Sequence, residues 1–135
     1  MNYHSLDPGF EFPEKSFLIS QKDADDYLDA VEDLSDIYDG AESFVAPTAL
    51  AAYALRGITE TIPVPPGAIH GSQELEFLGL VQPEEVIKCS GKVAQNSVKM
   101  KRRFVVIDLC VNAADGTLKL RGKTTLILPL ELEES

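Results

Sequence analysis

Hydrophobic and polar residues change their spacing twice along this 135-residue chain. From Pro47 to Arg56 the chain is rich in alanine and leucine and is apolar on nearly every side of a helical projection. Pro47 suits the first position of a helix, where its missing N–H would have no partner, and Gly57 suits a C-terminal stop. Because a helix without a polar face has to be buried, the pattern predicts one buried helix over residues 47–56.

After this helix the spacing becomes that of strands. Residues 62–67 contain three prolines and a glycine, which favours an extended, turning connection. Alternating segments follow, and in the last one leucines and Thr124 share one face. Residues 104–111 are almost continuously apolar, which predicts a strand covered on both faces. We interpret Gly91 and Gly122, inside strand-like segments, as bends or bulges of a sheet that wraps the helix.

Two further elements are expected before the buried helix. Residues 10–19 predict an edge strand, because Pro13 cannot donate to a ladder. Ser20 and Asp23 resemble an N-cap and its partner, and the helix they begin is expected to end near Asp33. The predicted fold class is therefore α+β, a curved antiparallel sheet wrapped around one buried central helix, in a single domain over residues 1–135.

Composition narrows the functional class. The net charge of −10 argues against general nucleic-acid binding, and no apolar run approaches the roughly 20 residues that span a membrane. The N-terminus lacks the pattern of a secretion signal, so a cytoplasmic location is expected. Two cysteines, Cys89 and Cys110, are too few for a disulfide framework and are interpreted as reduced core residues. No metal site is expected, since the few His and Cys lie far apart, and no motif indicates a cofactor.

The charges are unevenly distributed. Residues 21–42 contain nine acids and one lysine, whereas residues 88–103 contain six bases and no acid. Both stretches are interpreted as solvated faces. The alternative is that the basic stretch faces an anionic partner, such as the phosphates of coenzyme A or an acyl carrier protein.

The order of these elements resembles the hot-dog fold. Within it, the chain is similar to the MaoC-like dehydratases, and most of all to the N-terminal-type halves related to fatty-acid-synthase dehydratases. The resemblance extends from about Ile19 to Leu128. It is carried by Phe-Val-Ala-Pro-Thr at 44–48, by His-Gly-Ser-Gln-Glu-Leu-Glu-Phe at 70–77, and by Asp-Gly at 115–116 with Gly-Lys-Thr-Thr at 122–125.

The resemblance implies chemistry on (3R)-series acyl thioesters. Active members carry an Asp and a His five positions apart, which hold a water and move a proton at the alpha carbon, while the start of the buried helix donates N–H groups to the thioester oxygen. Here those two positions are Asp33 and Tyr38. An unperturbed tyrosine has a pKa of about 10, against about 6.5 for histidine, so it would be a poor base at neutral pH. The motif looks degenerate, and such halves bind the acyl chain while a partner chain holds the catalytic pair.

His70 is the remaining candidate for a catalytic base. It is expected either to lie beside the substrate tunnel or to be a strand residue satisfied by the backbone, and His4 is expected in a frayed N-terminus. Each of three other candidates has a structural alternative. Asp33 could be one more acid on an acidic helix end, Thr48 could cap or pack the helix start, and Arg56 could extend to the surface. The substrate-binding positions that the resemblance and the basic stretch suggest are Ala46, Pro47, Thr48, Gly71, Gln73, Lys101, Arg102 and Arg103.

The sequence is compatible with three functions. The first is an acyl-CoA or acyl-carrier-protein binding subunit, catalytically degenerate, that pairs with a MaoC-like chain. The second is an active homodimeric hydratase, dehydratase or thioesterase that uses Asp33, His70 or Tyr38. The third is a protein-interaction module that kept the fold and lost the tunnel.

Overall fold

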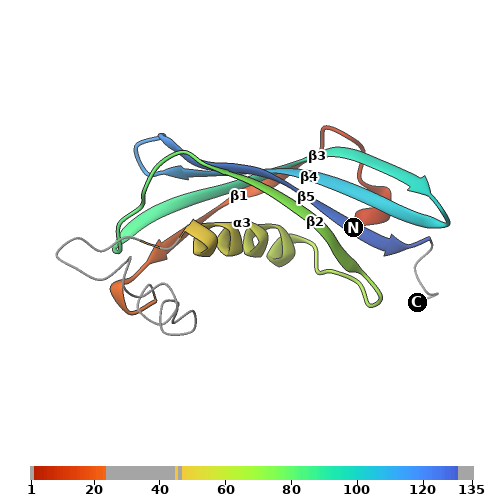
Figure 1. Ribbon diagram of the computed structural model, residues 1–135, viewed down its shortest axis with the longest axis horizontal. Coiled ribbons are helices and arrows are strands. Elements are labelled where there is room, and N and C mark those ends of the chain that lie inside the picture. The colour runs from red at the N-terminus through yellow and green to blue at the C-terminus, as the bar shows by residue number, and fades with distance from the viewer. Residues whose placement is uncertain (1, 24–44, 46, 131–135) are drawn as a thin grey trace.

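The computed structural model describes residues 2–23, 45 and 47–130 of the chain. The elements follow one another in a simple order (Figure 1). They are the 3₁₀ helix η1 (Tyr3–Ser5), strand β1 (Glu11–Ile19), helix α3 (Pro47–Thr61), and strands β2 (Ile69–Phe77), β3 (Glu85–Lys99), β4 (Arg102–Ala113) and β5 (Leu118–Pro129).

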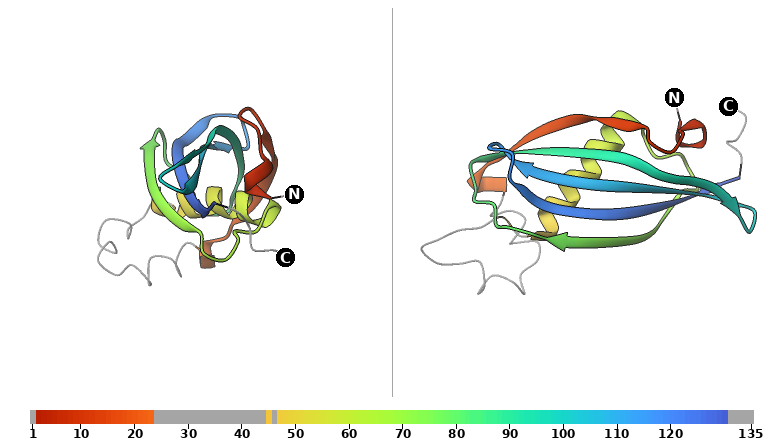
Figure 2. Two further views of the ribbon diagram at one scale, coloured as in Figure 1. Left: turned by 90° about the vertical axis from the view of Figure 1, so that its right-hand side faces the viewer. Right: turned by 90° about the horizontal axis from the view of Figure 1, so that it is seen from above.

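All five strands join one antiparallel sheet in the order β1-β3-β4-β5-β2. The sheet curls around α3, which lies against its concave side (Figure 2). We call the side that faces α3 the inner face and the opposite side the outer face. The first and second strands along the chain, β1 and β2, are the two edges, as Pro13 predicts for β1. The predicted fold class is confirmed.

Helix α3 is longer and less enclosed than the sequence predicts. It continues beyond Gly57 to Thr61. Gly57 does not end the helix, because it lies where the helix approaches the sheet: a Cβ there would be 3.6 Å from the Cβ atoms of Lys15 and Cys89. A stripe at every fourth position is exposed, consisting of Thr48, Ala52, Arg56 and Glu60. The sheet therefore covers most of the helix but not all of it, and Arg56 at the surface pairs with Glu60 at 2.7 Å.

The strand glycines allow close packing. Gly91 lies beside the register shift between β1 and β3, which falls between Phe12 and Lys15, whereas Gly122 remains in register with both β2 and β4. A Cβ on Gly91 would overlap Ile58 of α3. A Cβ on Gly122 would lie 2.5 Å from the carbonyl oxygen of Glu74. Gly122 is therefore not at a bulge, whereas Gly91 faces one in β1, and the missing side chains of both let neighbouring elements approach.

Strand β4 is buried on one face only. Its inner residues are fully buried, namely Val105, Ile107, Leu109 and Val111. Its outer residues, including Cys110, are only partly buried. The expectation of a strand covered on both faces is wrong. β4 is the central strand of the sheet, and side chains of the neighbouring strands β3 and β5 cover its outer residues only in part. Cys89 lies in the core, and both cysteines are free.

The N-terminal segment, residues 2–10, is docked onto the sheet, although the sequence predicts a frayed end around His4. Gly9 N–H donates to Val93 O at 2.7 Å, and Val93 N–H donates to Phe10 O at 2.8 Å. Tyr3 is fully buried. At the other end of β1 the predicted cap is confirmed, since Asp23 N–H donates to Ser20 Oγ at 3.0 Å. Most of the helix expected there lies outside the described residues.

Candidate functional site

Most of the inner face of the sheet is apolar. Among the described residues, Thr124 of β5 is the only polar side chain in the buried class. Gln73 of β2 lies directly opposite Thr124, and His70 lies opposite Leu126. Residues directly opposite each other in an antiparallel pair share a face, so His70 and Gln73 accompany Thr124 on the inner side. We call His70, Gln73 and Thr124 the polar cluster.

A short hydrogen bond joins two members of the polar cluster. The Thr124 hydroxyl oxygen lies 2.5 Å from His70 Nε2 and 3.5 Å from the carbonyl oxygen of Ser72. If the hydroxyl proton goes to Ser72, His70 donates from Nε2 and its Nδ1 is a free acceptor. If the proton goes to His70, Nδ1 carries a hydrogen and is a donor. Either arrangement fixes the imidazole ring and leaves Nδ1 available for another group.

A shift in strand register places His70 within reach of Thr124. The pairing of β2 with β5 slips between His70 and Ser72. Gly71 occupies the slip, and a Cβ there would lie 2.7 Å from Ile127 Cδ1. The missing side chain of Gly71 leaves room for the end of the Ile127 side chain, and the predicted contact of Gly71 with a substrate remains a prediction.

The third member of the polar cluster has an unused donor. The amide nitrogen Nε2 of Gln73 is buried without a hydrogen-bond partner among the described residues. Such orphan groups are rare and call for an explanation, for example a bound water or a functional role; His4 Nδ1 and Arg103 Nε are the other two among the described residues. Leu75 and Leu126 flank the cluster on the same face and pack with the core. An amide, an imidazole and a hydroxyl beside apolar surface would suit an oxygen atom on an otherwise apolar ligand.

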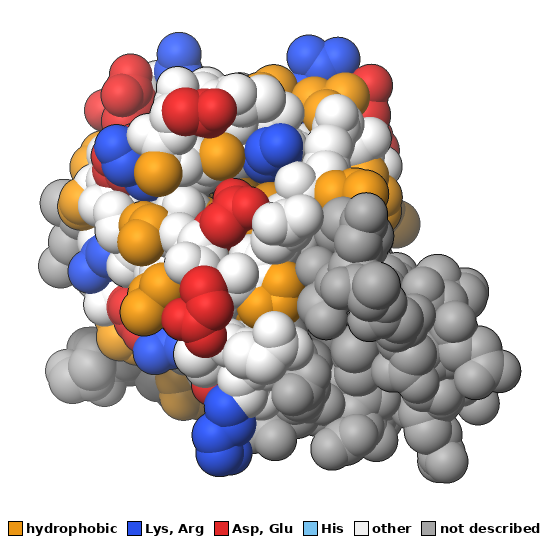
Figure 3. All heavy atoms as spheres, turned by 90° about the vertical axis from the view of Figure 1, so that its left-hand side faces the viewer, with side chains coloured by type: hydrophobic (Ala, Val, Ile, Leu, Met, Phe, Trp, Pro, Cys, Tyr) orange, Lys and Arg blue, Asp and Glu red, His pale blue; other side chains and the backbone are white. Residues whose placement is uncertain are grey.

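Helix α3 begins near the C-terminal end of β2, away from the polar cluster. Val45 N–H donates to Val81 O at 2.7 Å. This bond holds Val45, two residues before α3, against the chain that follows β2. Thr48 is exposed in the first turn. Charged side chains of both signs are interspersed on this end of the molecule (Figure 3). Asp33, Tyr38 and Ala46 lie outside the described residues, so their predicted roles remain predictions.

The basic residues of the β3–β4 hairpin lie at the opposite end of the sheet from the start of α3 (Figure 1). Lys101 and Arg102 are exposed, and the turn is tight, with positive φ at Met100 and Lys101. Arg103 is partly buried and donates from Nη1 to Asn96 Oδ1 at 2.9 Å. The structure does not bring these three residues together with the polar cluster, so any contact of theirs with a thioester phosphate stays a prediction.

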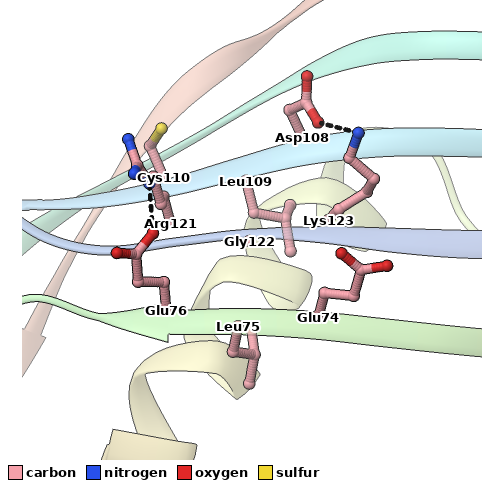
Figure 4. Close-up of a pocket in the computed structure, with 9 residues that line it drawn as sticks. All are labelled: Glu74, Leu75, Glu76, Asp108, Leu109, Cys110, Arg121, Gly122 and Lys123. Carbon is pink, nitrogen blue, oxygen red and sulfur yellow. Dashed lines mark hydrogen bonds and ion pairs between the residues drawn. The ribbon is translucent and has the colours of Figure 1, made fainter.

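The outer face carries a surface hollow of about 470 Å³ that the sequence reading did not identify. Its charged lining pairs across strands, Lys123 with Asp108 at 3.6 Å and Arg121 with Glu76 at 2.7 Å (Figure 4). The Lys123–Asp108 pair belongs to a row that crosses all five strands with alternating charge: Glu11, Lys92, Asp108, Lys123 and Glu74. Opposite charges on facing strands stabilise a sheet, so we assign the row to strand pairing.

Burial changes the pKa values of two core side chains. Desolvation raises the pKa of Tyr3 to about 12. Desolvation, with a smaller contribution from Glu14, raises the pKa of Cys89 to about 12. Cys89 is therefore a neutral core thiol at physiological pH and a poor nucleophile.

Within residues 2–23, 45 and 47–130, no group of His, Cys, Asp and Glu is arranged to hold a metal ion. No helix in the same ranges is long and apolar enough to cross a membrane.

No protein-family model matches this sequence, and no curated protein matches it. Solved structures do match. The (R)-hydratase from A. caviae involved in PHA biosynthesis superposes with a TM-score of 0.77 at 17% identity, covering 93% of this chain and 98% of that one. The MaoC-like dehydratase from Rhodospirillum rubrum gives 0.74 at 13% identity, covering 95% and 96%.

A two-chain assembly is also among the similar structures. A chain of the HadBC (3R-hydroxyacyl-ACP dehydratase) complex from Mycobacterium tuberculosis gives a TM-score of 0.69 at 16% identity, covering 92% of this chain and 98% of that one. The similarity covers 92–95% of this chain and 96–98% of the three matched chains. This protein therefore has the hot-dog fold of the MaoC-like dehydratases and (R)-hydratases.

Proposed function

We propose that this chain binds acyl thioesters of coenzyme A or an acyl carrier protein, as the substrate-binding subunit of a two-chain hydratase or dehydratase. The observation that carries the proposal is the polar cluster on the inner face. The cluster offers a buried, unpaired amide donor and a fixed imidazole beside apolar side chains. The (3R)-hydroxyacyl and enoyl groups combine the same features, an oxygen atom on an apolar chain.

The replacement of the expected histidine by Tyr38 supports a binding role over an active site. A second chain would then supply the catalytic Asp and His. The HadBC complex, in which two chains form a 3R-hydroxyacyl-ACP dehydratase, is a precedent among the similar structures. Fold alone does not fix function, so the proposal depends on the inner-face residues and on the partner edge.

Thr124→Val is expected to weaken binding of a crotonyl-CoA thioether analogue about tenfold, a loss of about 1.4 kcal/mol. The change keeps the side-chain shape, removes the hydroxyl and frees the imidazole of His70 to turn away. Thr125→Val is the matched control, because Thr125 is the next residue of β5 and faces outward. Calorimetric titration of each purified variant measures its affinity for the analogue. Equal affinities for the two variants would contradict a role for the polar cluster.

The alternative is an active homodimeric enzyme. The hydrogen bond between His70 and Thr124 favours it in the tautomer in which His70 Nε2 donates to the Thr124 hydroxyl, because the ring is then held with Nδ1 free to serve as a general base. Hydration of crotonyl-CoA by the chain alone, abolished by His70→Ala or Asp33→Ala, would establish that alternative. Binding without turnover would support the subunit role.

The edge strand β2 is the expected site of pairing with another hot-dog chain. It exposes Ile69 and Phe77, at 56% and 44% of their surface. The other edge, β1, contains Pro13, which has no N–H to donate and so discourages pairing with another strand. We therefore place the partner, either a second copy or a MaoC-like chain, along β2.

Ile69→Lys is expected to shift the purified chain from dimer to monomer, because the lysine would put a charge into the paired edge. Leu18→Lys on β1 is the control, since Leu18 is exposed to the same extent, 56%, on the opposite edge. Light scattering after gel filtration gives the mass of each variant. A wild-type chain that is monomeric alone and dimeric only with a MaoC-like chain would indicate the mixed pair. Dissociation by Leu18→Lys and not by Ile69→Lys would place the interface on β1 instead.

A further inference from the structure

The hairpin between β3 and β4 ends in a turn whose backbone conformation is unusual for its sequence. Lys99 and Arg102 are paired, so the turn consists of Met100 and Lys101 alone. Both turn residues have positive φ, 52° and 62°, as a type I′ turn requires, and such turns strongly prefer Asn-Gly. A methionine and a lysine in the left-handed region are strained. Because strain of this kind clusters at functional positions, the turn calls for a role for its side chains.

This turn places an apolar side chain at the extremity of the sheet. Met100 is 90% exposed, the highest value among the large hydrophobic residues that the structure describes, and Val98 is 49% exposed. The hairpin lies at the end of the sheet away from the start of α3 (Figures 1 and 2). Single exposed hydrophobic residues are ordinary, so the surroundings of Met100 decide what its exposure means.

Three cations flank the exposed methionine. Lys99, Lys101 and Arg102 are exposed, and none of them has an ion-pair partner among the described residues. We call residues 98–102 the hairpin tip. Lys99 Nζ lies 5.5 Å from the centroid of the Phe104 ring, which holds this cation at the base of the tip. The hairpin tip is therefore an apolar apex with positive charge on both sides.

The two strands of the hairpin carry no acid near this charge. On β3 and β4 the acid nearest to the hairpin tip is Asp108, six residues beyond Arg102. At roughly 3.3 Å per residue, the two lie about 20 Å apart. Charges at that distance are largely screened at physiological ionic strength, where the Debye length is about 8 Å. The acids of β3 and β4 therefore leave the hairpin tip positive, although the net charge of the chain is −10.

The size of the hairpin tip selects the kind of surface that it fits. A stable protein–protein interface takes about 800 Å² and about 20–30 residues from each partner, far more than residues 98–102 offer. A lipid surface needs less, because anionic headgroups attract each nearby Lys or Arg and the apolar layer beneath them takes up an inserted hydrophobic side chain. A convex tip with a methionine foremost and cations just behind it matches that layering.

We propose that the hairpin tip docks this protein on anionic membrane surfaces. Met100 inserts below the headgroups, and the three cations of the tip lie on the lipid phosphates. The contact is weak and reversible, since each cation contributes only about fivefold to partitioning and the three together about 100-fold. The proposal goes beyond acyl-thioester binding and does not depend on it, because the polar cluster lies on β2 and β5 and not on the hairpin.

Co-sedimentation with vesicles tests the proposal. The assay uses the full chain, so it includes the opposing charges of Glu131, Glu133 and Glu134, which follow β5 in the sequence and lie outside the described residues. We expect the wild type to sediment with vesicles of two parts phosphatidylcholine and one part phosphatidylglycerol. With phosphatidylcholine alone it should stay in the supernatant.

Two triple variants locate the contact. The tip variant, Lys99→Gln with Lys101→Gln and Arg102→Gln, should partition about 100-fold more weakly onto the anionic vesicles. The matched control is Lys88→Gln with Lys92→Gln and Lys119→Gln, three cations of β3 and β5 away from the tip. The control changes the net charge by the same amount and should bind as the wild type does.

Met100→Asn combined with Lys101→Gly separates docking from folding. Asn-Gly is the preferred pair for this turn, so the double variant should unfold at a higher urea concentration than the wild type. The same change removes the inserted side chain and one cation, so partitioning should fall at least about tenfold. A gain in stability together with a loss of binding is what a docking role predicts and a purely structural role does not.

The opposite results are equally clear. A wild type that does not sediment with the anionic vesicles, or a tip variant that binds as well as the control, overturns the proposal. Wild-type partitioning of the Asn-Gly variant also overturns it, because Met100 then does not insert. Release of the bound chain by inorganic phosphate would indicate a free-phosphate site and no membrane docking. A chain that ignores the vesicles but is retained through its tip by immobilised acyl carrier protein would make the tip a protein-docking surface instead.

Discussion

Gly122→Ala is expected to destabilise the protein by about 3 kcal/mol, at the upper end of what overpacking costs. The new Cβ would lie 2.5 Å from the carbonyl oxygen of Glu74 and 2.9 Å from Leu75 Cδ2. The carbonyl belongs to the backbone of β2 and cannot turn aside without breaking its pairing with β5. The polar cluster is built across the same strand pair, so acyl binding should fall together with stability. Urea unfolding followed by circular dichroism measures the change.

Gly57→Ala is the matched control for this prediction. Gly57 is also buried, but a Cβ there meets the Cβ atoms of Lys15 and Cys89 at 3.6 Å, an ordinary contact. Alanine is the better helix former by about 1 kcal/mol. We expect Gly57→Ala to be neutral or stabilising. If Gly122→Ala unfolds within about 0.5 kcal/mol of the wild type, β2 is not packed on β5 as described.

Alkaline pH is expected to remove a large part of the stability. The fold keeps Tyr3 neutral, raising its pKa from 10.0 to about 12, and keeps Cys89 neutral, raising its pKa from 9.0 to about 12. Burial also raises the pKa of Tyr53, although Arg56 opposes the shift. Because the unfolded chain ionises first, these contributions are complete below the ordinary pKa values. They are lost as pH rises through the folded ones.

The expected result is a free energy of unfolding that is level up to about pH 9 and falls steeply between pH 9 and 12. Each pKa unit corresponds to about 1.4 kcal/mol, which is large beside the 5–15 kcal/mol typical of a domain. Denaturant titrations at a series of pH values measure it. Tyr3→Phe should reduce the fall between pH 10 and 12, and Cys89→Ala should reduce it from pH 9. A stability that stays constant to pH 12 would refute the burial of both groups.

The local elements could be predicted because their signals are short-range. Pro47 and Ser20 mark helix starts through the backbone N–H groups next to them, and both predicted starts are observed. The alternation in the last strand fixes its inner face without knowledge of its partners, and Leu120, Leu126 and Leu128 are buried as expected. Gly57 misled the prediction, because a helix stop and a close helix–sheet contact both favour glycine.

The candidate site could be predicted only in part. His70 and Gln73 were candidate site residues, but Thr124, which is hydrogen-bonded to His70 and lies opposite Gln73, was predicted only as a residue of the buried face of its strand. Thr124 and His70 are 54 positions apart, and their contact depends on a register shift in β2 that no spacing in the sequence reveals. A threonine among leucines on the inner face of a strand is the signal that could have marked it.

By itself, the sequence determined the class of this fold: a helix starting at Pro47 and long alternating strands that bury one face, since periodicity follows from backbone geometry alone. Tertiary structure decided what those faces enclose. Strand order, the slip beside Gly71 and the docking of Tyr3 onto Ile62 depend on side chains far apart in the chain fitting together in three dimensions. That fit put a hydroxyl, an imidazole and an amide side by side next to apolar side chains.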